Sequence, residues 1–244
     1  MNRSEKDYRD ARAAYRQLPL RQKLGHIWLY HKWPILLSLT AVLVLGSVIY
    51  RVLTRKEPVL YLALVNVAVG SELEQPLTEG FLEAAGFDPA RQALQLYPDL
   101  YLARETDERT HRSAYATRIK LMASVEQQQL DLILMSGESY GILSSQGYLL
   151  PVAELLEQAP ELTDALAPLI TENEVTLEDN DIEYQLGEAA EHRVVTETVA
   201  NGLRLDPLPF FAARFEEPLY LGIVANTPRR GVCLDFLRYL LAAG

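Results

Sequence analysis

The chain has 244 residues, with 33 Asp+Glu against 23 Lys+Arg, 13 Gly, 13 Pro and a single Cys. This composition excludes collagen-like and low-complexity proteins, and one cysteine excludes a disulfide framework. The charge is unevenly spread, because residues 1–33 carry 8 Lys+Arg and 3 Asp+Glu, whereas residues 57–244 carry 12 Lys+Arg and 30 Asp+Glu. So acidic a main body argues against a nucleic-acid partner, since phosphate binding needs clustered Lys and Arg.

The first predicted element is a membrane span. Between Lys32 and Arg51 lie 18 residues without a charge, ten of them Leu, Ile or Val. As a helix they would extend roughly 27 Å, and Arg51 can snorkel so that the span reaches Leu53. We therefore expect one transmembrane helix over residues 34–53. The alternatives are a buried helix of a soluble protein and a signal peptide, but the 33 preceding residues and the lack of a small-x-small cleavage site oppose the latter.

The flanks of this span predict its orientation. Aromatic and basic side chains expected at the membrane interfaces are Trp28, Tyr30, Trp33, Tyr50 and Arg51. The excess of Lys and Arg before the span places the N-terminus in the cytoplasm, so we expect a single-pass protein of the cell membrane with an extracytoplasmic C-terminal domain. We expect residues 1–33 to be a cytoplasmic basic segment with an amphipathic helix from Pro19 that lies on the bilayer. The alternatives are a solvated flank and a segment that docks on a partner.

The outer domain, residues 57–244, begins with alternating strand and helix patterns. An apolar run over 59–69 predicts a strand buried on both faces, and a helical pattern over 77–85 ends at Gly86. Residues 93–102 predict a second strand, which Pro98 places at an edge. Tyr115, Ile119, Met122 and Ala123 repeat at helical spacing, and 130–135 is the next buried strand. This order predicts an α/β domain with a parallel sheet.

The second half of the domain is more varied. Residues 136–140 (SGESY) turn into a helix that ends near Gly147, and another helix starts beyond Pro151. Residues 171–193 are strongly acidic and predict a charged hairpin or a mobile insertion. Asn201-Gly202 is a hairpin turn signal. The chain closes with a strand over 219–227 and a helix over 232–244.

Several of these pieces together resemble the type 2 periplasmic solute-binding proteins of ABC importers. The resembling segments are VLYLALVNV, YATRIKLMASVEQQQLDLILMSG with its Asp131-Leu132 pair, YGILSSQGYLLPVAELL and LYLGIVANTPRRGVCLDFLRYLL. The resemblance thins out over 154–216, where the family has a full second lobe. It therefore implies a membrane-anchored α/β domain with a reduced second lobe, and an ABC transporter permease as partner.

The resemblance also implies where a ligand would bind. In this fold the ligand lies in a cleft between lobes, at the carboxyl ends of strands and at helix N-termini. The candidate ligand-binding residues are Asn66, Ser136, Glu138, Ser139 and Tyr140. The alternative is that these residues only cap a helix and form a turn. Glu138 argues against an anionic ligand, and a small-molecule ligand stays uncertain because the reduced lobe leaves the cleft incomplete.

Residues 137–141 also satisfy G-x-S-x-G after a strand and before a helix, which is the context of a serine-hydrolase nucleophile. His192 is the one histidine that follows Ser139, with Asp179 or Asp181 as possible third members of a triad. No oxyanion loop is recognisable, and His192 lies in an acidic stretch, so we expect Ser136 or Ser139 to cap a helix and the protein not to be an enzyme.

No metal or cofactor is expected. Asp179, Asp181 and Glu183 alternate as in a calcium loop, but Tyr184 stands where glycine is needed.

From the predicted membrane span and the resemblance we expect an accessory subunit that docks on a membrane complex, with an ABC-type transporter as the first candidate. A stand-alone ligand-binding or sensing module and a serine hydrolase using Ser139 are the alternatives.

Overall fold

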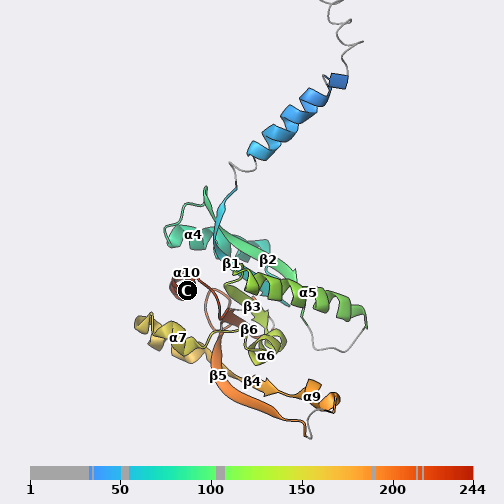
Figure 1. Cartoon of the computed structure of the whole chain (residues 1–244). Helices are drawn as coiled ribbons and strands as arrows, with labels where there is room; N and C mark the ends of the chain where they lie inside the picture. The colour runs from blue at the N-terminus through green and yellow to red at the C-terminus, as the bar shows by residue number, and fades with distance from the viewer. Residues whose placement is uncertain are drawn as a thin grey trace, which may run out of the picture. The chain divides into compact units, whose positions relative to one another are not determined.

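The computed structural model describes residues 33–34, 36–50, 55–102, 108–187, 191–212, 214–215 and 217–243 (Figure 1). The chain divides into two compact units, Met1–Arg55 and Lys56–Gly244. Each unit is described by itself below.

The N-terminal unit contains a helix over residues 36–50. The Thr40 hydroxyl donates to the carbonyl of Leu36 at 2.9 Å, so this polar side chain is satisfied within the helix. Among the expected interface residues Trp33 and Tyr50 are exposed, while Trp28, Tyr30 and Arg51 lie outside the described residues, as does most of the segment 1–33. Within the described residues, no helix is both long and apolar enough to cross a membrane.

The second unit is built on one mixed six-stranded sheet in the order β2-β1-β3-β6-β5-β4. Its strands are β1 (Glu57–Val65), β2 (Gln92–Leu100), β3 (Leu132–Ser136), β4 (Ile170–Asp179), β5 (Val194–Arg204) and β6 (Leu219–Ile223). The pairs of β1 with β2 and β3 are parallel, whereas the pairs of β6 with β3, β5 with β6 and β4 with β5 are antiparallel. The α/β class is confirmed, and the expectation of a parallel sheet holds for only half of it.

Helices cover both faces of this sheet. The helices of this unit are α3 (Ser71–Gln75), the π-helix η1 (Pro76–Gly80), α4 (Phe81–Ala84), α5 (Glu108–Glu126), α6 (Gly137–Ser145), α7 (Val152–Leu156), η2 (Pro160–Leu162), α8 (Thr163–Leu166), η3 (Ala167–Leu169) and α10 (Arg230–Ala242), together with α9 (Asp181–Gln185) after the end of β4. Leu62 of β1 belongs to the core on the face of α4, α7 and α10. The next residue, Ala63, belongs to the core on the face of α5 and α6. Alternating side chains of one strand thus fill two separate cores.

Short-range signals placed most of these elements well. Gly86 and Gly147 have φ angles of 77° and 72°, which end their helices as the sequence predicted. β2 is an edge strand, as Pro98 indicated. In α5 the helix is confirmed, but Tyr115, Ile119 and Met122 are exposed, and from residue 114 onward Thr117 and Leu121 are its buried residues.

The Asn201-Gly202 turn signal was wrong, because both residues lie inside β5. Gly202 is needed there for space, since a Cβ at this position would lie 2.4 Å from the Tyr140 ring. The chain reverses instead between the antiparallel strands β4 and β5, where α9 lies, so the acidic segment is the charged hairpin that the sequence allowed.

The region expected to form a reduced second lobe, 154–216, has a different arrangement. Its strands β4 and β5 join the same sheet as β1 and β3, and Lys56–Gly244 forms one compact unit. The described residues from 154 to 215 therefore add a long hairpin to the edge of the single sheet, where the sequence predicted a reduced second lobe.

A buried carboxylate ties three parts of this unit together. Asp131, which precedes β3, is fully buried, and its carboxylate accepts from the Tyr61 backbone N–H at 2.9 Å and from the Thr227 hydroxyl at 2.5 Å. The Arg229 guanidinium donates to the same carboxylate at 3.0 and 3.3 Å and lies over the Tyr61 ring. Asp131 thus fixes β1, β3 and the turn before α10 relative to one another.

We predict that Asp131→Ala lowers the free energy of unfolding of fragment 57–244 by about 3 kcal/mol, because a backbone donor, a hydroxyl and a guanidinium lose their common acceptor. Urea denaturation measures this. Glu154→Gln is the control, since Glu154 pairs with Arg230 at the surface, and it should change stability by less than about 0.5 kcal/mol. Equal effects of the two variants would contradict the role assigned to Asp131.

Candidate functional site

The candidate site lies where β1 and β3 end. Because β1 lies between β2 and β3 and is parallel to both, the chain leaves β1 and β3 at the same edge of the sheet. Crevices at the carboxyl ends of neighbouring parallel strands are where ligands bind in open α/β sheets. An open pocket of about 220 Å³ lies here, lined by Asn66, Val67, Ala68, Ser136, Phe215, Glu217, Pro218 and Leu219.

Asn66 lines this pocket but its side chain serves the fold. It adopts a positive φ of 55°, which asparagine tolerates better than most residues. Its carboxamide oxygen accepts from the Leu102 N–H at 2.9 Å, and its amide nitrogen donates to the Leu102 carbonyl. The carboxamide therefore fastens the chain after β2 to the end of β1, and Asn66 shapes the pocket more than it offers a group to a ligand.

Ser136 is the last residue of β3 and directly precedes α6. Its hydroxyl oxygen accepts from the Ser139 N–H at 3.4 Å, which makes Ser136 the N-cap of α6 as the sequence predicted. Glu138 is exposed in the first turn, where a carboxylate suits the helix dipole. Ser136 thus combines a structural role with a place in the pocket wall.

Ser139 and Tyr140 turn away from the pocket into the protein. Ser139 is fully buried, and its hydroxyl lies 3.3 Å from that of Ser136. Tyr140 stacks on Tyr220 with ring centroids 4.9 Å apart, and burial raises the pKa of its hydroxyl to about 12. Of the five predicted ligand-binding residues, the structure brings Asn66 and Ser136 to the pocket.

The Tyr140 hydroxyl belongs to a buried polar cluster. It lies 3.0 Å from both the Thr171 carbonyl and the Asn201 side-chain oxygen, which also accepts from Ser144 at 2.8 Å. These contacts join α6 to β4 and β5, so Tyr140 fastens the base of the hairpin to the rest of the unit.

The sequence missed Phe215, Glu217 and Pro218, which line the pocket from the segment before β6. No local motif marks them. They reach the pocket because β6 runs antiparallel to β3, so that the start of β6 lies beside the end of β3, with Leu219 opposite Ser136. The pairing of β3 with β6 is the signal that would have predicted these residues at the pocket.

The described contacts do not assemble a serine-hydrolase triad. His192 Nε2 lies 3.2 Å from an Asp179 oxygen and 4.0 Å from Asp181, at the far end of β4. α6 contacts the other end of that strand, where Asn173 donates to the Gly141 carbonyl. Asp179 lies six positions after Asn173, which is roughly 20 Å along the hairpin. Ser139 and His192 therefore have separate partners.

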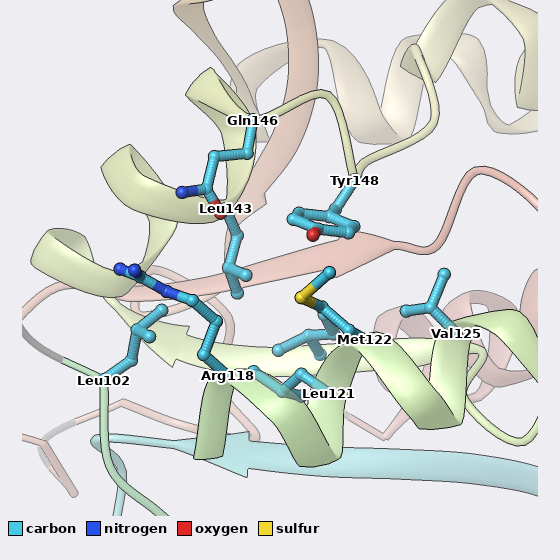
Figure 2. Close-up of a pocket in the computed structure, with 9 residues that line it drawn as sticks. Leu102, Arg118, Leu121, Met122, Val125, Leu143, Gln146 and Tyr148 are labelled. Atoms are coloured by element: carbon cyan, nitrogen blue, oxygen red, sulfur yellow. The ribbon is translucent and has the colours of Figure 1, made fainter. Parts of the chain in front are cut away.

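A second hollow lies between α5 and the segment after α6 (Figure 2). It encloses about 10 Å³ and is mostly apolar, with Leu143, Met122 and Tyr148 around it. The Nε atom of Arg118 is buried there without a hydrogen-bond partner among the described residues. This volume is about that of a single water molecule, so the hollow is too small for an organic ligand.

The described residues contain no group of three or more His, Cys, Asp or Glu that could hold a metal ion. Cys233 is buried in α10, and burial raises the pKa of its thiol, with Asp131 contributing further. This thiol is therefore protonated at neutral pH and packs as a small apolar residue.

Comparison of the chain with protein-family models, with curated proteins and with solved structures finds no match.

We predict that a fluorophosphonate probe, which reacts with activated serine nucleophiles, leaves the full-length protein unlabelled, because the Ser139 hydroxyl is buried beside Ser136. Labelling is followed by mass spectrometry of the intact chain, with an active serine hydrolase as the positive control. Labelling that disappears in Ser139→Ala and persists in Ser144→Ala would establish a nucleophile at this position and overturn the prediction.

Proposed function

We propose that this protein is a membrane-anchored, extracytoplasmic subunit, built like one lobe of a solute-binding protein, that docks on a membrane complex, an ABC-type transporter first. The observation that carries the proposal is the open pocket at the ends of β1 and β3, which lies in a unit with one sheet and has no second lobe to close over it among the described residues.

The helix over residues 36–50 supports the anchoring part of the proposal. Its leucine, valine and isoleucine side chains are exposed around the whole helix, from Leu36 at 51% to Leu37 at 73%. A helix that is apolar on all sides needs an apolar environment all round, and a bilayer provides one. The basic residues before it favour an N-terminus in the cytoplasm, which would place the acidic α/β unit outside.

The strand arrangement supports the likeness to a solute-binding protein. The order β2-β1-β3 includes two parallel pairs, and a pocket lies at the carboxyl ends of β1 and β3, as in binding folds with open α/β sheets. This likeness is one of arrangement, and the family's usual partners, membrane permeases, enter the proposal through the resemblance of the sequence.

Pocket size favours docking over capture of a free ligand. The pocket of about 220 Å³ is open to solvent, whereas pockets that bury most of a small molecule measure about 300–1,000 Å³. An open pocket leaves a ligand partly solvated, so few contacts offset the entropy lost on association. A stand-alone binding or sensing module is the second candidate, and the polar lining by Ser136 and Glu217 is the observation that favours it.

We predict that the tagged full-length protein, extracted from its native membranes in mild detergent, co-purifies with a multi-spanning permease and its ATPase subunit. The matched control is the chain ending at residue 56, which keeps the membrane segment and lacks the α/β unit. This truncated chain should lose the partner. If it retains the partner, or if the full chain purifies alone, docking through the α/β unit is contradicted.

We also predict that fragment 57–244 shows no thermal shift above about 2 °C with libraries of sugars, amino acids, peptides and metal ions. A ligand at a hundredfold excess over its Kd would add about 2.7 kcal/mol, which raises Tm by several degrees in a domain of this length. A saturable shift with one ligand class, lost in Glu217→Gln, would favour the sensing module instead.

A further inference from the structure

The hairpin of β4 and β5 extends beyond the other strands of the sheet (Figure 1). β4 and β5 pair from Ile170–Leu203 at the base to Asp179–Val194 at the far end. β6 pairs with β5 only at Leu203 and Arg204, so the rest of the hairpin is a two-stranded ribbon without a third strand. A two-stranded ribbon is only marginally stable in water by itself, so contact with another molecule would stabilise this part of the hairpin.

The far part of this ribbon carries a set of exposed apolar side chains. We call them the tip patch: Leu177, Ile182, Tyr184, Leu186 and Val194, each between 46% and 71% exposed. At Val175, nearer the base, the side chain is buried, so the core ends before the patch begins. Single exposed apolar residues are ordinary, but five within one protruding segment indicate a surface that another molecule covers.

Hydrogen bonds between backbone and side chains stabilise the turn at the tip of the hairpin. The Asn180 side chain accepts from the Arg193 N–H at 2.6 Å and donates to the Glu191 carbonyl at 2.9 Å. His192 adds a contact of 3.2 Å to Asp179. These bonds join the two ends of the turn, and they do not involve the side chains of Ile182 or Leu186. Tyr184 lies against the His192 ring, with ring centroids 5.8 Å apart. The side chains of Ile182 and Leu186 remain 71% and 68% exposed, so they are open to a molecule outside the hairpin.

The charges around the tip patch indicate the chemistry of that occupant. Glu178, Asp179, Asp181, Glu183 and Glu191 accompany it, and Arg193 is the one Lys or Arg in the described residues from 171 to 197. Because the whole outer domain is acidic, a second copy would be repelled, and so would an anionic lipid surface. A protein groove that is apolar in its centre and lined with Lys and Arg at its rim matches the patch.

We propose that the tip of the β4–β5 hairpin is the docking element that enters an apolar, basic-rimmed groove on a protein subunit of the membrane complex. This inference rests on the proposed function and names the surface that performs it. The apolar side chains supply the buried contact, and the carboxylates orient the approach and select a basic partner.

The test places a photo-reactive benzoylphenylalanine at position 186 of the full-length chain, with position 119 on α5 as the matched control. Ile119 is also an exposed apolar residue, but it lies on another element. Irradiation in native membranes should cross-link position 186, and not position 119, to a peptide of a membrane subunit that contains Lys or Arg. A cross-link to lipid, to a second copy of the chain, or from position 119 alone would overturn the inference.

Substitutions test the two parts of the surface separately. Ile182→Ser with Leu186→Ser should reduce the recovered partner about tenfold, and Ile119→Ser should leave it unchanged. Asp181→Asn with Glu183→Gln should also weaken recovery of the partner. The control pair, Glu72→Gln with Glu74→Gln in α3, should weaken it less. Adding 1 M salt to the wild type should reduce recovery as the tip substitutions do, because salt screens the charges. A thermal melt of each variant verifies folding.

The outcomes separate the two proposals. If the wild type recovers the partner and the tip variants recover it equally well, the docking element lies elsewhere and the proposed function stands. If the wild type recovers no partner, both proposals fail. Loss of recovery confined to the tip variants supports both.

Discussion

The buried carboxylate of Asp131 is the interaction on which the α/β unit depends. A carboxylate without solvent is tolerated only when donors surround it, and here β1 gives a backbone N–H while the turn before α10 gives a hydroxyl and a guanidinium. The carbonyl of Asp131 also accepts from the Val224 N–H at 2.9 Å at the end of β6. Asp131 therefore joins the middle of β1, the start of β3 and the end of β6, and the pocket forms where β1 and β3 end and β6 begins.

The sequence revealed those elements whose signals are local. The apolar runs of β1, β3 and β6 and the glycines at 86 and 147 report on their own backbone, and each was predicted correctly. The orientation of β6 and the place of β5 depend on pairings between residues far apart in the chain, which no local pattern encodes. Asn201-Gly202 illustrates this limit, because the glycine is required by the ring of Tyr140, which lies more than sixty positions earlier.

The same distinction applies to the candidate site. Asn66 and Ser136 could be predicted to meet because the carboxyl ends of parallel neighbours share one edge. Ser139 and Tyr140 follow Ser136 closely, but each helical residue turns by about 100°, so Glu138 is exposed while Ser139 and Tyr140 point into the core. Glu217 reaches the pocket through an antiparallel pairing, and the sequence offered no sign of it.

The acidic hairpin contains two kinds of residue that have different physical reasons to be there. β4 is the last strand of the sheet, and its exposed glutamates keep this edge from pairing with another strand, which explains them without any partner. Edge protection gives no reason for Ile182, Tyr184 and Leu186, because exposed apolar groups next to a free edge promote the very association that the charges prevent. These apolar side chains have a physical reason to lie beside the acidic edge strand if a cationic partner, which the same carboxylates attract, covers them. In this proposal, the negative charge that disfavours self-association also selects a basic partner.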